Sequence, residues 1–228
     1  MSNLIAVRGV DPWRRRLYLP AYRVVDAARY VGQSPQLIAN WHYRETKLGV
    51  ALPGKQLGKP LSYLQLIEVA VVSTFRKLGV SLPTIRKARQ YLAQNFNSEY
   101  PFAEYIFKTE GFHVLLDLQQ FEADEDMRLI VTDKGGQLAW EKIMEDCLLE
   151  FDYEYELALK WHLAGRQSLV VIDPRVAFGA PTVSGLPTWI LKGRHQAGES
   201  IDDIKEDFRL DEVAIRDGLG FEGITIAA

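Results

Sequence analysis

Residues 22–44 of this 228-residue chain read YRVVDAARYVGQSPQLIANWHYR, and the stretch predicts two helices joined by a short turn. In its first half, small apolar residues recur at the spacing of one helical face. Gly32 then breaks the pattern, and Ser34 followed by Pro35 is a strong signal for the start of a second helix. A helix, a glycine-containing turn and a capped second helix together make the helix-turn-helix pattern.

The second helix is expected to bury an apolar stripe that includes Leu37 and to leave its polar side chains exposed. Gln36 and Asn40 carry amides that can hydrogen-bond adenine, and the guanidinium of Arg44 can hydrogen-bond guanine. The same side chains would also suit a solvated surface helix, and the sequence leaves that alternative open.

The segment that follows, residues 42–60, is rich in glycine and proline and is basic. We interpret it as a wing, a loop or hairpin whose lysines contact phosphates. The predicted DNA-binding residues of helix and wing are Ser34, Gln36, Asn40, Tyr43, Arg44, Lys47, Lys55 and Lys59.

Two further helix starts lie downstream. Ser62 with Gln65 three residues on predicts a capping box, and Ser81 predicts another cap. The helix after Ser81 is expected to point its basic side chains outward, namely Arg86, Lys87 and Arg89. Two helices after a wing, over residues 20–95, resemble the winged helix-turn-helix of the MerR kind.

Charge divides the chain into two halves of opposite sign. Residues 1–96 hold 15 Lys and Arg against 4 Asp and Glu, a net charge of +11. Residues 97–228 hold 12 basic and 26 acidic residues, a net charge of −14. A basic half indicates a polyanion-binding surface, and an acidic half indicates a surface that repels polyanions or binds a basic protein.

Composition narrows the class of protein. An apolar fraction of 47% is ordinary for a globular chain, which has room for one to two domains at this length. Its single cysteine, Cys147, excludes an intramolecular disulfide and fits a reducing compartment. The start of the sequence lacks the pattern of a signal peptide, and no apolar run approaches ~18 residues. We therefore expect a cytoplasmic protein without a membrane span.

The acidic half predicts strands mixed with helices. Short alternating strands are expected within 112–118 and 128–132, followed by a helix over 136–149. From 151 to 161, apolar residues occupy every odd position, which predicts one long strand with an aromatic face. Its other face begins with Asp152, Glu154 and Glu156. The fold class is therefore α+β, with an antiparallel pair completed by residues 169–172.

No residue pattern supports catalysis or metal binding. Three carboxylates on alternate positions of a strand lie roughly 7 Å apart, too far for one small cation without other ligands. The four histidines are scattered along the chain, and no Ser/His/Asp, Cys/His, zinc or phosphate-loop arrangement occurs. We expect no enzyme activity, no metal and no cofactor.

The last sixty residues carry the sharpest motif. Asp173-Pro174, Gly179-x-Pro181, Gly185 and Ala197-Gly198-Glu199-Ser200 precede two short helices. This pattern resembles the bacterial domain-of-unknown-function family 433, although Leu186-Pro187 stands where that family has Thr-Arg. The resemblance implies a hairpin plus three short helices in a second helix-turn-helix-like outline. Its acidic helices would repel a phosphate backbone, so we do not expect this unit to bind DNA.

A MerR-like reader joined to such a domain resembles the VapB-type antitoxins of type II toxin–antitoxin operons. The resemblance implies repression of the chain's own promoter and neutralisation of a PIN-like ribonuclease toxin. The expected regions are a DNA-binding domain over 1–96, a connecting and dimerisation region over 97–167, and the hairpin and helices over 168–228.

A homodimer is expected, because one winged helix offers few base contacts. The predicted toxin-binding residues are Asp152, Glu154, Glu156, Asp202, Asp203 and Glu206. A MerR-like regulator that responds to a small ligand and has no toxin partner is the alternative.

Overall fold

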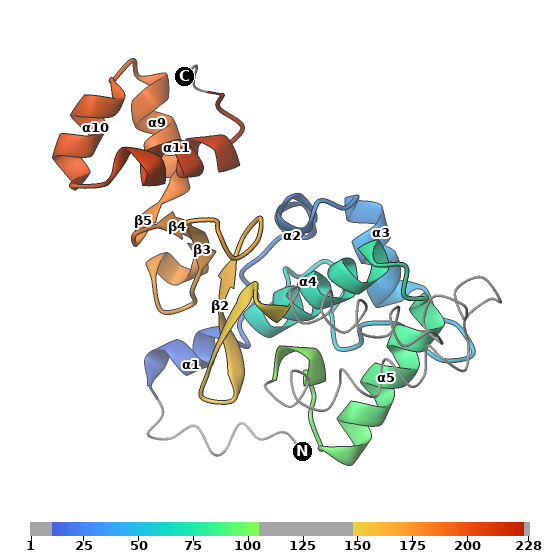
Figure 1. The fold of residues 1–228 in the computed structure, drawn as a ribbon. Helices are drawn as coiled ribbons and strands as arrows, with labels where there is room; N and C mark the ends of the chain where they lie inside the picture. The colour runs from blue at the N-terminus through green and yellow to red at the C-terminus, as the bar shows by residue number, and fades with distance from the viewer. Residues whose placement is uncertain (1–10, 105–147, 226–228) are drawn as a thin grey trace, which may run out of the picture. The chain divides into compact units, whose positions relative to one another are not determined.

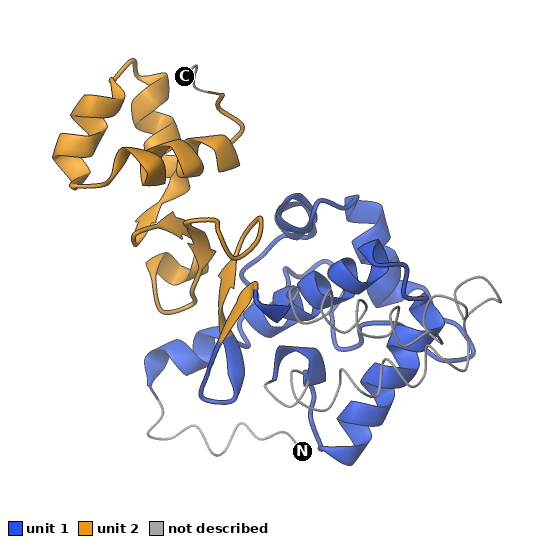
Figure 2. Cartoon of the chain, in the orientation of Figure 1, with its two compact units in different colours: residues 1–149, 153–158 blue, residues 150–152, 159–228 orange. Residues whose placement is uncertain are grey.

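The computed structural model describes residues 11–104 and 148–225 (Figure 1). The chain divides into two compact units, an N-terminal unit of residues 1–149 and 153–158 and a C-terminal unit of residues 150–152 and 159–228 (Figure 2). The strands and helices expected between residues 105 and 147 lie outside the described residues. The described elements are helices and a five-stranded antiparallel sheet, so the α+β class is confirmed.

The N-terminal unit is built from helices. They are α1 (Pro12–Arg16), α2 (Val24–Val31), α3 (Pro35–Tyr43), α4 (Tyr63–Lys77), α5 (Leu82–Asn95) and the 3-10 turn η2 (Pro101–Ala103). Helix α4 is buried along nearly its whole length, and it contacts α2, α5 and η2 (Figure 1). It is therefore the core element against which α2, α5 and η2 pack.

The helix starts predicted from single serines are confirmed. Ser34 Oγ accepts a hydrogen bond from Leu37 N at 3.2 Å, and Ser81 Oγ accepts one from Thr84 N at 3.2 Å. Ser62 and Gln65 form the reciprocal capping box. Gly32 ends α2 with a φ of +64°, a left-handed conformation that glycine adopts without steric cost.

Two expectations about burial were wrong. Leu37 is 37% exposed, because burial on α3 is confined to residues 38, 41 and 42. Arg86 and Arg89 do not point into solvent but are both buried. Helix α5 is covered on more than one side, since it packs against both α4 and η2, and that leaves fewer outward positions than a surface helix has.

The segment expected to be a wing, residues 42–60, begins in the last two residues of α3 and continues as an extended loop over residues 44–62. Leu61 pairs with Tyr22 in an isolated antiparallel bridge, and Leu52 N donates a hydrogen bond to Trp41 O at 2.9 Å. The loop is thereby attached at one end to the chain before α2 and in its middle to α3. Within residues 11–104, this segment contributes no strand pair of its own.

Five strands form one sheet in chain order, β1 to β5 (Figure 1). They are β1 (Phe151–Glu154), β2 (Leu157–His162), β3 (Val170–Ile172), β4 (Pro181–Val183) and β5 (Leu186–Pro187). Trp161 pairs with Ile172, Val171 with Thr182, and Val183 with Leu186, all in antiparallel register. Sequential order with antiparallel pairing is a meander, which needs only short connections.

The single long strand expected over residues 151–161 was wrong, because the chain turns back at Tyr155 and Glu156 to form the β1–β2 hairpin. Both residues have positive φ, 52° and 62°, as a two-residue type I′ turn requires. Neither is the Asn or Gly that announces such a turn. Tyr155 is held instead by its ring contact with Trp13, at a centroid distance of 5.7 Å.

Three helices complete the C-terminal unit, α9 (Thr188–Gln196), α10 (Ile201–Phe208) and α11 (Glu212–Phe221), together with the short 3-10 turn η4 (Ala177–Gly179). Ser200 caps α10 in a capping box with Asp203, as the Ala-Gly-Glu-Ser turn predicts. Helix α11 contacts α9, α10 and strands β3 and β4, so it joins the helices to the sheet.

Candidate nucleic-acid and protein interfaces

Helix α3 presents the predicted base-reading residues along one strip. Gln36 and Asn40 lie one turn apart, and Gln36 Nε2 donates a hydrogen bond to Asn40 Oδ1 at 3.1 Å. Arg44 follows as the C-cap residue of the helix, and its side chain is exposed. The structure therefore brings an amide pair and a guanidinium onto the exposed side of α3, a set of groups able to read base edges.

The loop lysines differ in what they contact. Lys55 Nζ donates to Tyr43 Oη at 2.8 Å, to Lys59 O at 2.6 Å and to Gln56 O at 3.2 Å. An ammonium group has three donors, so Lys55 is fully used in holding the loop against the end of α3. Lys47 and Lys59 are exposed and are the better candidates for phosphate contacts.

Tyr43 takes part in the same contact between the loop and α3. Its hydroxyl accepts the Lys55 bond and donates to Gln56 O at 3.2 Å, and Lys55 Nζ also lies 5.3 Å from the centre of the tyrosine ring. Tyr43 is still partly exposed. Its first role in this geometry is to fix the loop, which was not evident from sequence spacing.

Lys77 joins the candidate DNA surface, although no sequence pattern pointed to it. A β-carbon placed on Gly32 would lie 3.7 Å from Lys77 Nζ. The end of α4 therefore carries its ammonium group to the turn between α2 and α3. The apolar stripe of α4 predicts only its buried face, so this position depended on the packing of α4 against α2.

His42 is one of the buried residues of α3. Its Nδ1 donates to Leu52 O at 2.8 Å, and its Nε2 has no hydrogen-bond partner in the described residues. Burial lowers the pKa of His42 to about 4, and the nearby cations Lys55 and Arg89 add to this effect. The imidazole is therefore neutral at physiological pH and adds no charge to the surface.

The acidic residues of α10 are exposed, but they are not equivalent. Asp203 accepts hydrogen bonds from Ser200 Oγ at 2.6 Å and Ser200 N at 3.1 Å, and these bonds lower the pKa of its carboxyl group. Asp203 is thus part of the helix cap. Asp202 and Glu206 are not part of the cap and are exposed, so they remain candidates for binding a partner.

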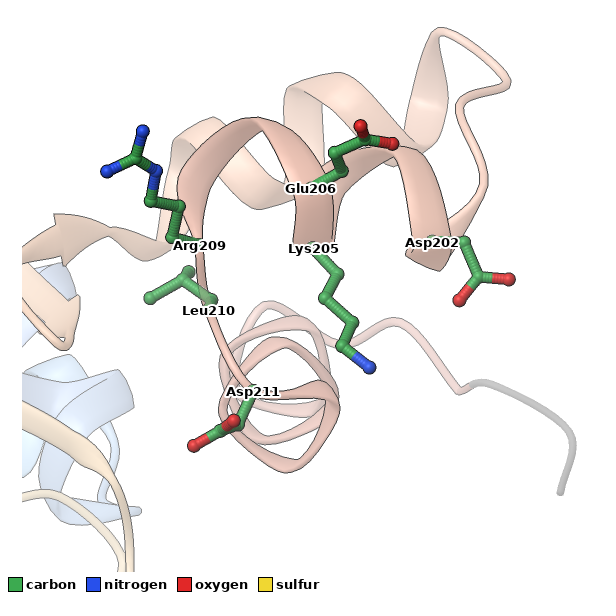
Figure 3. A pocket seen from close by; sticks show the side chains of 6 residues that line it. All are labelled: Asp202, Lys205, Glu206, Arg209, Leu210 and Asp211. Carbon is green, nitrogen blue, oxygen red and sulfur yellow. The ribbon is translucent and has the colours of Figure 1, made fainter.

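An open depression of about 400 Å³ lies beside these residues, between α10 and the start of α11 (Figure 3). Its lining combines carboxylates, cations and one apolar side chain: Asp202, Lys205, Glu206, Arg209, Leu210 and Asp211. Lys205 extends from α10 toward α11 across it (Figure 3). Such a mixed lining suits polar contacts with a protein surface better than capture of an apolar small molecule.

Asp152, Glu154 and Glu156 do not form a uniform anionic row. Asp152 is ion-paired with Arg166 and with Lys160 Nζ at 3.7 Å, and it also lies within hydrogen-bond distance, 3.1 Å, of His162 Nε2. Partial burial works against ionisation, but the hydrogen bonds from Arg166 and His162 keep the pKa of Asp152 below its ordinary value. Glu156 is exposed in the turn, whereas Glu154 is half-buried.

The contacts of Asp152 also bear on catalysis, because they bring Asp152, His162 and Ser168 together. His162 Nδ1 faces the Ser168 carbonyl oxygen at 3.4 Å, and the Ser168 hydroxyl donates to Asp217 at 3.2 Å. The imidazole therefore does not activate the serine hydroxyl as a Ser/His/Asp nucleophile requires. In the described ranges, no group of three or more His, Cys, Asp or Glu side chains could hold a metal ion.

None of the helices in residues 11–104 and 148–225 is long and apolar enough to cross a bilayer.

Comparison with known proteins places these surfaces in context. No protein-family model matches the chain. The chain is 24% identical over 227 residues to a Mycobacterium tuberculosis protein named "Putative antitoxin VapB45", and the match covers 90% of this chain and 94% of that protein. The crystal structure of Rv2018 from M. tuberculosis matches with a TM-score of 0.70 at 24% identity, over 90% of this chain and 99% of that chain. The chain is therefore a distant homologue of the M. tuberculosis protein named "Putative antitoxin VapB45" and shares the fold of Rv2018.

Proposed function

We propose that this chain is the antitoxin of a type II toxin–antitoxin system, that it represses its own promoter and that it neutralises a PIN-like ribonuclease in the cytoplasm. The observation that carries the proposal is the likeness, over 90% of the chain, to a protein named as an antitoxin. In this proposal, residues 1–96 bind DNA, residues 97–167 connect and dimerise, and residues 168–228 bind the toxin with help from the β1–β2 hairpin.

The DNA-binding half of the proposal is supported by charge and by α3. Residues 1–96 carry a net charge of +11, and the exposed strip of α3 offers Gln36, Asn40 and Arg44. In the proposed complex α3 enters the major groove, and Lys47, Lys59 and Lys77 contact the phosphates on either side.

Fluorescence anisotropy with the promoter of the chain's own operon tests this half. Asn40→Ala or Arg44→Ala is expected to cost about 1–3 kcal/mol on the cognate site and to relax sequence preference there. Glu45→Gln, which changes one exposed charge beside them, serves as the matched control. Unchanged affinity in the Asn40/Arg44 double variant would remove α3 from the recognition role.

The toxin-binding half is supported by the acidic charge of residues 97–228 and by the exposed carboxylates of α10. A ribonuclease needs a basic rim to bind RNA, so an anionic partner surface is complementary to it. Charge complementarity of this kind speeds association and excludes RNA from the same rim.

Growth rescue on co-expression with the nuclease of the adjacent reading frame tests this half. Asp202→Lys/Glu206→Lys removes two exposed carboxylates and spares the Asp203 cap, and Glu156→Lys separately tests the hairpin tip without disturbing the Asp152 cluster. At least one of these changes is expected to abolish rescue, with Glu45→Lys as the control for net charge. If both variants rescue growth fully and toxin binding in a pull-down does not depend on salt concentration, the acidic face is only a solvated surface.

The proposed assembly is a homodimer, because two half-sites supply the base contacts that one reader lacks. Light scattering of the full chain at micromolar concentration is expected to give twice the monomer mass. A chain that binds operator but never rescues growth would instead be a MerR-like regulator without a toxin partner.

A further inference from the structure

Arg86 is a buried cation that has no counter-ion among residues 11–104 and 148–225. Arg86 lies on α5 and is only 8% exposed. Its Nε has no hydrogen-bond partner in the described part of the chain. A buried guanidinium that is neither ion-paired nor fully hydrogen-bonded is costly to the folded state. Such a group therefore indicates a missing anion.

Arg89, one turn further along α5, shows what the same helix does with a structural arginine. Arg89 Nε donates to Glu68 Oε1 at 3.0 Å, and its Nη2 donates to Glu68 Oε2 at 3.1 Å and to Glu99 O at 2.6 Å. The two arginines are about equally buried, yet in the described part of the chain Arg89 has a carboxylate partner and Arg86 has none. The absence of a partner at Arg86 is thus specific to that position.

The charged group that acts most on Arg86 is another cation, Arg44. Burial lowers the pKa of Arg86, and the guanidinium of Arg44 lowers it further. Among the described residues, no carboxylate forms an ion pair with either side chain. Two guanidinium groups from α5 and the end of α3 thus reinforce each other's field, and each presents the planar donors that fit a tetrahedral oxyanion.

We propose that Arg86 and Arg44 together bind one backbone phosphate of the operator DNA. The inference rests on the proposed DNA-binding function and adds to it the anion that completes the buried arginine. DNA is the favoured source of phosphate because Arg44 ends the helix whose Gln36 and Asn40 strip faces the bases. A phosphate fixed in this way sets the register of α3 in the groove and carries no sequence preference itself.

Arg86→Met in the full chain separates this role from a structural one. Removing an uncompensated buried charge is expected to raise the melting temperature of the DNA-free protein. The same change is expected to weaken operator binding about tenfold and to reduce the salt slope by about one, the value for one lost phosphate contact. A purely structural arginine would lower stability and affinity together, and that result would overturn the proposal.

Three further variants serve as comparisons for Arg86→Met. Arg86→Lys keeps the charge and is expected to retain the salt slope, with part of the affinity. Arg89→Met leaves Glu68 unpaired and is expected to lower the melting temperature, in contrast to Arg86→Met. Arg216→Met removes one charge from the exposed face of α11 and is expected to leave operator affinity and salt slope unchanged.

Inorganic phosphate, compared with sodium chloride at equal ionic strength, distinguishes the two sources of the anion. Phosphate is expected to raise the melting temperature of the wild type, and both this rise and the operator affinity are expected to depend on Arg86. A phosphate effect that needs Arg86, with operator affinity that does not, would assign the site to a free anion and overturn the DNA assignment. Wild-type binding to the operator with no effect of Arg86→Met on either readout refutes this inference alone, whereas no wild-type binding to the operator refutes the proposed function as well.

Discussion

Gly218 of α11 lies so close to Leu191 of α9 that a β-carbon at Gly218 would be 2.7 Å from Leu191 Cδ1. Val183 of β4 would be met at 3.4 Å on the same side. The two helices and the sheet therefore converge at a position that only glycine fills without displacement, and this contact joins α9 and α11 to β4.

The first prediction follows from that contact. Gly218→Ala is expected to lower the free energy of unfolding by about 1–3 kcal/mol, because the added methyl group overpacks the junction. Gly220→Ala is the matched control, since its β-carbon would meet nothing within 4 Å and helix propensity favours alanine by roughly 0.5–1 kcal/mol. Thermal melts of both variants check the contrast, and equal shifts would show that the junction relaxes freely.

The second prediction concerns the buried pair of Glu68 and Arg89. Glu68 is 1% exposed, and burial raises its pKa even though the charge of Arg89 opposes that shift. Glu68→Gln is expected to cost about 3–5 kcal/mol, because it leaves the guanidinium buried beside a neutral amide. Replacing both residues with methionine is expected to cost much less.

Urea unfolding of the two single variants and the double variant measures the coupling between Glu68 and Arg89. Strictly additive losses would mean that the two charges do not depend on each other.

The third prediction is a dependence of stability on pH. The pKa of His42 is about 4 in the folded chain and about 6.5 in the unfolded chain. Below pH 6.5 the unfolded state takes up a proton that the folded state refuses, so stability is complete above pH 6.5 and falls as the pH approaches 4. The difference corresponds to roughly 3 kcal/mol for this group.

His42→Gln is expected to flatten the stability profile between pH 6.5 and pH 4, measured by urea unfolding across that range. The charged groups nearest the imidazole, Lys55 and Arg89, keep their charge over the whole window, so they do not contribute to the slope. A variant with the same slope as the wild type would assign the pH dependence to other groups.

The fourth prediction separates the loop lysines. Lys55→Met is expected to lower the melting temperature, because it removes one hydrogen bond from the loop to Tyr43 and two within the loop, to Gln56 O and Lys59 O. Lys47→Met and Lys59→Met are expected to leave the melting temperature unchanged and to reduce the salt slope of operator binding by about one each. If Lys55→Met instead reduces the salt slope of operator binding without lowering the melting temperature, Lys55 is a phosphate contact.

The sequence by itself determined the helix starts and the α+β class. Ser34, Ser62, Ser81 and Ser200 each cap the helix predicted for them, because a cap is a hydrogen bond between residues three apart and needs no distant partner. Gly32 was found for the same reason, since a left-handed residue at a helix end is a local requirement.

Tertiary structure decided which polar side chains are available to bind. The hairpin at Tyr155 and Glu156 lacks turn residues and is held by a contact with Trp13, which lies far away in sequence. Lys55 donates a hydrogen bond to Tyr43, and among the described residues Arg86 has no anion beside it whereas Arg89 has Glu68. Periodicity gives the face on which a residue lies, but the partner on that face comes from a distant segment, so these contacts follow only from the folded chain.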